Sequence, residues 1–319
     1  MKRIGFFVVV LVLVLLAVPL VVSAQDEGTT QAAYEAVLSA EPMYGVIESE
    51  VEIERDGQMI RGTLALPDGT DGPYPIVLLL HGFTGSRNEL PILGVEGDFF
   101  YARTARMLAE QGFASLRIDF IGSGESDGEW AETTFSSQIA DAQAAVDYLP
   151  NLDGIDPERI GIIGLSQGGL VASAVAGSGS PIDSVVLWSP VAVPAATYPE
   201  ILGQRCFSLG LVSEQVTCLL PWAAYTTLNQ PFFQDVFNVD PIAEISHYEG
   251  PLMVVAGLRD ATVAPQPYMS ELYINNHDGA EMLVTVDGEH VFDVLVPEAG
   301  ATVLDDVIAW SLAWLTQTL

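Results

Sequence analysis

Residues 159–174 read Arg-Ile-Gly-Ile-Ile-Gly-Leu-Ser-Gln-Gly-Gly-Leu-Val-Ala-Ser-Ala. Residues 159–163 have the length of a strand and are apolar after Arg159, and 170–174 have the composition of a helix. The stretch between them has the pattern G-x-S-x-G, which places a serine on a strained turn between a strand and a helix. A bare G-x-S-x-G also occurs in ordinary glycine-rich turns. The flanking strand and helix favour Ser166 as a nucleophile.

Apolar runs of strand length recur along the chain and are separated by helix-like segments. The runs cover residues 76–80, 114–118, 160–164, 184–188, 252–256 and 282–286. Residues 99–111, 135–149 and 302–315 carry apolar side chains at helical spacing. Continuous apolar strands that alternate with helices indicate a parallel sheet covered on both faces.

Two segments do not follow this alternation of strands and helices, and they indicate how the chain is organised. Residues 46–54 and 59–66 alternate apolar and polar side chains around Asp56-Gly57, which predicts a hairpin. From residue 189 to 245 the alternation of strands and helices stops, and prolines, aromatic residues and both cysteines accumulate. We therefore expect an N-terminal segment at 25–45 and an α/β domain at 46–319, with a cap inserted at about 190–245.

The N-terminus predicts export from the cytoplasm. Lys2 and Arg3 precede an uncharged apolar run at residues 4–22, and Val22-Ser23-Ala24 offers small residues for signal peptidase. Residues 1–24 are thus predicted to be a signal peptide. The alternative is an uncleaved membrane anchor at residues 4–22, because nineteen residues are just long enough to span a bilayer.

The charge balance is strongly acidic. The chain has 42 Asp and Glu residues against 11 Lys and Arg, giving a formal net charge of −31. Such a surface repels nucleic acids and anionic lipids, so we expect neither as a partner and no stable membrane partner unless the anchor is retained. An ordinary acidic exported enzyme and adaptation to high salt are both compatible with this excess.

Cys206 and Cys218 are the two cysteines of the chain. In a chain bound for an oxidising compartment, an even pair predicts a disulfide, with two buried free thiols as the alternative. No further Cys or His lies nearby to make a metal site, and we expect neither a metal nor an organic cofactor.

A nucleophilic serine needs a histidine base and an acid that orients it. Of the four histidines, His290 directly follows the last predicted strand, where loops build active sites. Asp260 follows the strand at 252–256, and the order Ser166, Asp260, His290 is the triad order of α/β-hydrolases. Asp287 and Asp293 are nearer in sequence but are expected to serve a turn and a helix start.

An oxyanion hole requires two N–H donors aimed at the tetrahedral intermediate. One is expected from Gln167, the residue after the nucleophile. The other is expected from the loop His81-Gly82-Phe83-Thr84-Gly85, most directly from Phe83. A tight turn with no catalytic part is the alternative for this loop.

Three segments together resemble the bacterial cinnamoyl and feruloyl esterase branch of the α/β-hydrolases: 81–86, 117–126 and 166–169. The resemblance covers roughly residues 46–188 and 240–319. It implies a mostly parallel eight-stranded sheet flanked by helices, a cap after the sixth strand, and hydrolysis of small or polymer-linked esters with an aromatic or other apolar acyl group. In that family the loop and the residue after the nucleophile supply the oxyanion donors, in agreement with Phe83 and Gln167.

The sequence also departs from that family. Leu165 stands where members commonly have histidine, and the cap aromatics show no hydroxycinnamate-binding pattern. These aromatics, at positions 207, 222, 225, 232 and 233, either line a pocket or form the core of the cap. Two other functions stay open: a serine peptidase of the prolyl-oligopeptidase type, which uses the same triad order, and a non-catalytic binding protein on the same fold.

Overall fold

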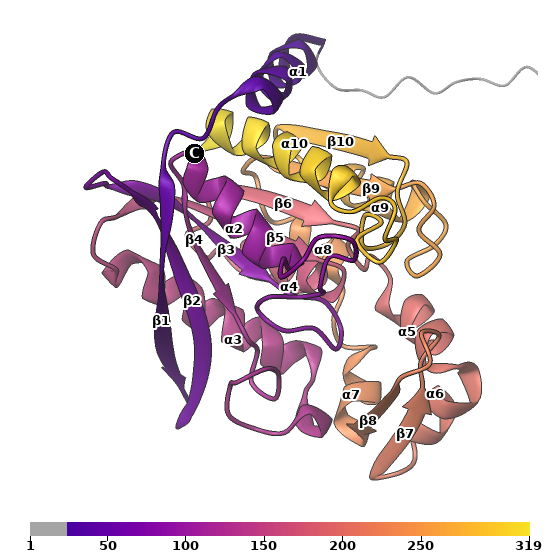
Figure 1. Ribbon diagram of the computed structural model, residues 1–319. Coiled ribbons are helices and arrows are strands. Elements are labelled where there is room, and N and C mark those ends of the chain that lie inside the picture. The colour runs from indigo at the N-terminus through magenta and orange to yellow at the C-terminus, as the bar shows by residue number, and fades with distance from the viewer. Residues whose placement is uncertain (1–23) are drawn as a thin grey trace, which may run out of the picture.

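The computed structural model describes residues 24–319, which form a central sheet with helices on both faces and a cap at one end (Figure 1). The eight strands of this sheet are β1 (Gly45–Arg55), β2 (Gln58–Asp68), β3 (Tyr74–Leu80), β4 (Ala114–Ile118), β5 (Ile155–Leu165), β6 (Ser184–Trp188), β9 (Leu252–Gly257) and β10 (Glu281–Val286).

The strands lie in the order β1-β2-β4-β3-β5-β6-β9-β10. Six of these strands, β4, β3, β5, β6, β9 and β10, run parallel to one another. Strand β2 is antiparallel to both β1 and β4. The predicted α/β class with a mostly parallel eight-stranded sheet is confirmed. The carboxyl ends of β3, β5, β9 and β10 therefore meet along one edge of the sheet, where loops can converge on a site.

Residues 24–319 form ten α-helices. They are α1 (Ala24–Ser39), α2 (Phe100–Glu110), α3 (Phe135–Tyr148), α4 (Gln167–Gly177), α5 (Pro194–Leu202), α6 (Gln204–Gly210), α7 (Gln230–Asp235), α8 (Pro241–Ile245), α9 (Tyr268–Ile274) and α10 (Thr302–Thr318), with short 3₁₀ turns at Trp130–Glu132 and Leu149–Asn151. Buried side chains of α2 and α10 join the core on one face of the sheet, and those of α3, α4, α8 and α9 join the core on the other.

Strand β3 shows why the predicted strands are apolar without interruption. Ile76, Leu78 and Leu80 belong to one core, and Val77 and Leu79 belong to the other. Successive side chains of a strand point to opposite faces, so a strand covered on both faces needs apolar residues at every position. The same reason explains β4 and β6, whose bounds agree with the predicted runs to the residue.

The predicted hairpin is also present. β1 pairs with β2 from Gly45↔Asp68 to Arg55↔Gln58, and the turn between them consists of Asp56 and Gly57. Both turn residues have positive φ, 53° and 82°, as a two-residue turn of the I′ type requires. Asp and Gly adopt this conformation at low cost, which is why the pair predicts the turn.

The segment at 25–45 contains a helix that its sequence does not predict. Helix α1 packs on α10, and the ring of Tyr34 stacks on Trp310 with centroids 4.2 Å apart (Figure 1). The Tyr34 hydroxyl donates to Asp306 at 3.3 Å. Because α1 has no marked apolar face of its own, its helical state depends on this tertiary contact.

The chain between β6 and β9 forms the cap, which lies at the lower right in Figure 1. It begins with α5 and α6 and continues into a small antiparallel pair, β7 (Gln215–Leu219) and β8 (Tyr225–Asn229), and then α7. A disulfide between Cys206 and Cys218 joins α6 to β7, with the Cα atoms 5.8 Å apart. The cap after the sixth strand, expected from the resemblance, is thus confirmed, and it contains regular elements where the sequence shows no clear alternation.

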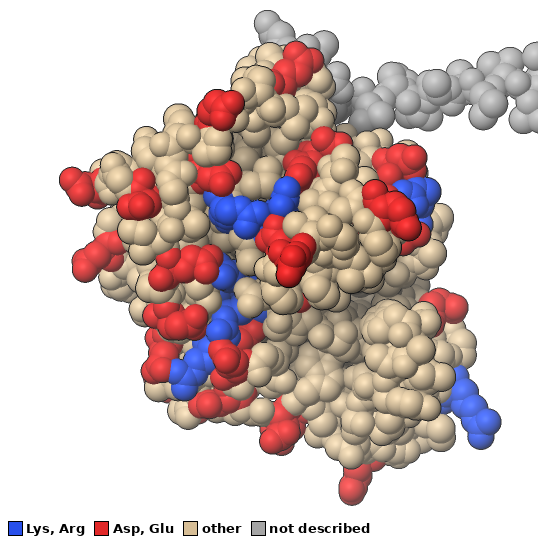
Figure 2. All heavy atoms as spheres, in the orientation of Figure 1, with Lys and Arg blue, Asp and Glu red and all other residues tan. Residues whose placement is uncertain are grey.

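The predicted signal peptide and the alternative anchor at 4–22 lie outside the described residues, except for Ala24. Within residues 24–319 no helix is long and apolar enough to cross a membrane. Acidic side chains are spread over the face shown in Figure 2, whereas the part of that face formed by the cap carries few charges.

Candidate active site

Ser166 occupies a strained turn between β5 and α4. Its backbone has φ 56° and ψ −113°, outside the regions that residues with a side chain usually adopt. Its N–H donates to Trp188 O at 2.8 Å, and its own carbonyl accepts from Gly169, Leu170 and Val191. These bonds hold the serine in the strained conformation, which is typical of functional sites.

The glycines of the G-x-S-x-G segment are required by close backbone approach. A Cβ on Gly164 would overlap the carbonyl of Gly168, and a Cβ on Gly168 would overlap the carbonyl of Leu80. Gly169 faces Pro190 in the same way, at 2.8 Å. Helix α4 can therefore begin directly against β3 and β6, with Ser166 at its start.

Asp260 and His290 are joined by a hydrogen bond of 2.7 Å between Asp260 Oδ2 and His290 Nδ1. A carboxylate can only accept, so Nδ1 carries the proton and Nε2 is left free to act as a base. The other oxygen, Asp260 Oδ1, accepts from the N–H groups of Thr262 and Val263 at 2.7 and 2.9 Å. Two backbone N–H groups thus fix the acid and, through it, the imidazole.

Ser166 and His290 line the same pocket, which has a volume of about 390 Å³. Its wall is mostly apolar, from Phe83, Leu90, Leu165, Ile201, Trp222, Val291 and Leu295, with Gly82, Thr84, Glu89, Arg259, Ala261, Thr262 and Glu289 completing it. A largely apolar wall with a few convergent polar groups is the usual form of a small-molecule site.

Both residues expected to supply oxyanion donors lie at this pocket or directly beneath it. Phe83 is part of the lining. Gly82, the residue before it, lies beside the nucleophile, because a Cβ placed on Gly82 would be 3.5 Å from Ser166 Cβ. Gln167 is the first residue of α4, so its N–H has no partner within the helix. The positive end of the helix dipole adds to the potential that favours negative charge there.

Glu89 is a pocket residue that the sequence did not predict. Its Oε2 accepts from the N–H of Gly82 at 2.9 Å, and no ion pair among residues 24–319 includes it. Burial without a cationic partner raises the pKa of Glu89 to about 7. A single carboxylate in a loop has no periodic pattern around it, so no sequence signal distinguishes it from a solvated side chain.

Arg259, next to Asp260, links the loop after β9 to the loop after β10, which contains His290. Its guanidinium binds Asp287 at 2.6 Å and Asp293, which lie on either side of His290. Asp293 also accepts from the N–H of Glu289 at 2.9 Å, so it stabilises the turn around His290. The helix start expected at Asp293 is absent, because the next helix begins at Thr302. The expectation that Asp287 only serves a turn was incomplete, since its carboxylate belongs to this ion-pair cluster.

The other histidines lie away from Ser166 or serve the backbone. His81 is fully buried, accepts from the N–H of Phe120 at 3.3 Å and donates from Nδ1 to Gly82 O at 2.9 Å. Burial lowers its pKa, in agreement with a neutral structural role. The polar sequences around His247 and His277 predict exposed positions. His247 is exposed, but the ring of His277 is buried and donates to Gly250 O at 2.9 Å.

Some of the cap aromatics form the core of the cap, and one lines the pocket. Phe207, Phe232 and Phe233 are buried in the core of the cap. Trp222 is 48% exposed and lines the pocket, whereas Tyr225 is exposed elsewhere. One tryptophan of the cap therefore reaches the candidate site, and the three buried phenylalanines stabilise the cap itself.

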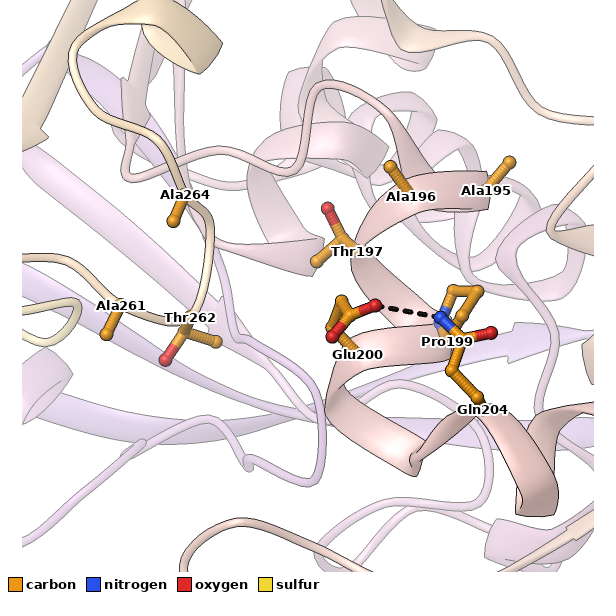
Figure 3. A pocket seen from close by; sticks show the side chains of 9 residues that line it. All are labelled: Ala195, Ala196, Thr197, Pro199, Glu200, Gln204, Ala261, Thr262 and Ala264. Carbon is orange, nitrogen blue, oxygen red and sulfur yellow. Dashed lines mark hydrogen bonds between the residues drawn. The ribbon is translucent and has the colours of Figure 1, made fainter.

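A second hollow adjoins this pocket and has a volume of about 560 Å³ (Figure 3). It lies between helix α5 and the loop that follows β9, and Ala261 and Thr262 line both spaces. The remaining wall comes from Ala195, Ala196, Thr197, Pro199, Glu200, Gln204 and Ala264. Gln204 donates to Glu200 at 2.8 Å across one turn of chain, as Figure 3 shows.

Comparison with known proteins supports the assignment of the fold. A family model described as the alpha/beta hydrolase fold matches residues 75–209. The structure of Est1E from Butyrivibrio proteoclasticus, solved with ferulic acid bound, is similar with a TM-score of 0.67 at 23% identity, over 83% of this chain and 99% of that one. The Pyrococcus furiosus esterase Pf2001 is similar with a TM-score of 0.56 at 25% identity, over 84% and 93%.

Curated relatives match only in part. An uncharacterised 31.7 kDa protein of Escherichia coli is 34% identical over 108 residues, which is 34% of each protein. The chain thus spans about a third of the length of this relative. The matched family model, the strand order and the turn that carries Ser166 together show that this chain has the α/β-hydrolase fold.

Proposed function

We propose that this protein is an exported serine hydrolase that cleaves carboxylic esters with an apolar acyl group. The observation that carries the proposal is the hydrogen bond between Asp260 and His290, because His290 lines the same pocket as Ser166. Ser166 is the nucleophile, His290 the base and Asp260 the acid that orients it. The N–H groups of Phe83 and Gln167 form the oxyanion hole.

The mechanism proceeds through an acyl-enzyme. His290 Nε2 takes the Ser166 proton as Oγ attacks the ester carbonyl, and the two N–H groups bind the oxyanion of the tetrahedral intermediate. The intermediate collapses, and the alcohol leaves with the proton from His290. Water then attacks the acyl-enzyme with the same histidine as base, which releases the acid and restores Ser166.

The pocket favours an uncharged acyl group. Its wall is largely apolar, so burying a charged acyl group against it would cost desolvation energy. The ferulic acid bound in Est1E, a protein of similar fold, supports the proposal of an aromatic acyl group. An aromatic or aliphatic acyl group would pack against Phe83, Ile201 and Trp222.

The adjoining hollow offers room for the alcohol part of the ester. It shares Ala261 and Thr262 with the pocket and is lined by small side chains and hydrogen-bonding groups (Figure 3). A substrate whose ester carbonyl lies at Ser166 can extend past Thr262 into this space. The proposed substrate is therefore an ester in which both the acyl group and the alcohol are sizeable, one for each space.

Export is proposed from two independent features. The leader expected at residues 1–24 directs the chain across a membrane, and the disulfide between Cys206 and Cys218 requires an oxidising compartment to persist. We infer that the mature protein acts outside the cytoplasm. N-terminal sequencing of the exported protein would check this, with Gln25 as the expected first residue.

The function is tested with a panel of aryl and alkyl esters and aminoacyl-proline amides, assayed with the wild type and with Ser166→Ala. We expect ester hydrolysis by the wild type and none above background by the variant, together with labelling of the wild type alone by a fluorophosphonate. Hydrolysis confined to the amides would favour a peptidase. Full ester hydrolysis by Ser166→Ala would refute the nucleophile, and absence of both hydrolysis and labelling would favour a binding protein.

A further inference from the structure

Tyr198 of helix α5 belongs to the cap but contacts both residues proposed to form the oxyanion hole. Its side chain is fully buried. Its hydroxyl donates to Gln167 Oε1, and its ring meets the ring of Phe83 edge-on, with centroids 5.5 Å apart and an interplanar angle of 83°. A single cap residue thus touches the donor residue on α4 and the donor residue on the loop after β3.

The hydrogen bond to Gln167 is part of a directed chain. Gln167 Nε2 donates to Gln138 Oε1 at 2.6 Å, and Gln138 Nε2 donates to Thr133 Oγ1 at 3.2 Å. All four side chains are in the interior, so none can exchange its partner for water without cost. The amide of Gln167 is therefore held from two sides, by α5 of the cap and by α3 of the main domain.

The ring of Phe83 is held in the same way. Its neighbours are Tyr198, Phe232 of α7 and Trp130, with ring centroids 5.4 to 5.7 Å away. Two of these three rings belong to the cap. Phe232 also meets Tyr198 edge-on at 5.4 Å, so the two cap residues support each other.

These contacts matter because an oxyanion hole works only within a narrow geometry. Its donors must lie 2.7–3.1 Å from the place of the developing oxyanion, and a small displacement costs most of the stabilisation. The bond between Asp260 and His290 comes from loops after β9 and β10 and does not involve the cap. The triad and the oxyanion hole therefore depend on different parts of the molecule.

We propose that Tyr198 is a positioning residue that couples the cap to the oxyanion hole, by holding Gln167 through its hydroxyl and Phe83 through its ring. This inference rests on the proposed esterase function and names what controls its transition-state binding. A cap that is in place completes the oxyanion hole. If the cap shifts away, the triad stays assembled, but Gln167 and Phe83 lose their contacts with Tyr198 and their N–H groups are no longer held in position.

The test compares Tyr198→Phe with wild type and with Tyr74→Phe. Tyr74 is a matched control because it is also buried and its hydroxyl bonds to backbone carbonyls, but it begins β3 at the end of the sheet opposite the site. We expect Tyr198→Phe to lower kcat about tenfold, less than the loss of an entire donor, with KM within about threefold of wild type. Tyr74→Phe should keep both constants.

A second readout separates positioning from a general structural role. An alkylboronic acid forms a tetrahedral adduct with the serine and uses the oxyanion hole, whereas the carboxylic acid product binds without such an adduct. In Tyr198→Phe, we expect boronate affinity to fall in parallel with kcat/KM and product affinity to stay unchanged. Gln138→Met should reproduce the loss, and the double variant should lose less than the product of the two single losses, because both act on Gln167.

Equal kcat and equal boronate affinity in Tyr198→Phe and wild type would overturn the coupling. So would an equal loss of boronate and product affinity, which would indicate a general loss of structure. Failure of the esterase function is a distinct result, since it appears as the absence of ester hydrolysis in the wild type or its persistence in Ser166→Ala.

Discussion

Asp260 and His290 form a 2.7 Å hydrogen bond although 30 positions separate them in the chain. They follow β9 and β10, which are adjacent and parallel, and the two loops are drawn together at the backbone. The N–H of Arg259 donates to Gly288 O at 2.9 Å, and a Cβ on Gly257 would lie only 2.6 Å from the carbonyls of Gly288 and Glu289. The contact is thus a property of the sheet and of a close approach that needs a glycine.

Replacing the acid of this pair should remove most of the activity without unfolding the protein. Asp260→Asn keeps the shape of the side chain but favours the wrong tautomer of His290, so we expect kcat to fall by about 10³- to 10⁴-fold with little change in KM. Steady-state assays with an aryl ester check this. Asp278→Asn removes an exposed aspartate outside the site, so it is the control and should keep the activity. A loss under threefold in Asp260→Asn would exclude Asp260 as the orienting acid.

Glu89 should make stability depend on pH. The pKa of Glu89 is raised to about 7 in the folded protein against 4.5 for an ordinary Glu, so the folded state holds a proton that the unfolded state releases between these values. Its contribution to stability is complete below about pH 4.5 and is lost as the pH rises through about 7. Glu89→Gln cannot ionise and escapes this loss.

We therefore expect the stability of Glu89→Gln relative to wild type to rise between pH 5.5 and 8, by at most about 3 kcal/mol, and to change no further above pH 8. Urea unfolding at a series of pH values measures the difference. Glu96→Gln removes the same charge from an exposed position and should show no such trend. A difference that is constant with pH, or that falls as the pH rises, would contradict the buried, unpaired state of Glu89.

The disulfide should stabilise the cap. Cys206 and Cys218 are 12 positions apart, and closing a loop of this length removes entropy from the unfolded chain, which raises its free energy by about 3 kcal/mol at 25 °C. The double variant Cys206→Ser/Cys218→Ser should therefore unfold at a lower temperature than the oxidised wild type. Thermal unfolding with and without reductant checks this, because reductant should affect only the wild type. Equal melting of oxidised and reduced wild type would show that the bond contributes nothing.

Filling the second hollow should discriminate between alcohols. Ala196→Trp places a large ring in the space between α5 and the loop after β9, and it should raise KM for esters of bulky alcohols by roughly tenfold, equivalent to about 1.4 kcal/mol. Methyl esters of the same acid should be hydrolysed as before. Ala243→Trp, on an exposed position of α8 outside the hollow, is the matched control. Equal effects on methyl and bulky esters would place the alcohol elsewhere.

Local sequence patterns predicted most of the main sheet. Residues 114–118 and 184–188 match β4 and β6, because buried parallel strands need unbroken apolar runs. β5, in contrast, begins at Ile155, five positions before the predicted run, since polar residues around Pro157 hide its first part. Helix α1 was not predicted, because its stability comes from the stacking of Tyr34 on Trp310.

The turn at Ser166 could be predicted from the sequence because its determinants are local: a strand, a glycine-flanked serine and a helix within sixteen residues. Asp260 and His290 could be proposed because chain order and strand ends are also readable. The partners of Glu89, Gln138 and Tyr198 could not, since each acts through a contact made by chain folding. Burial and hydrogen bonding across distant segments decide their states, and these depend on tertiary packing rather than on neighbours in sequence.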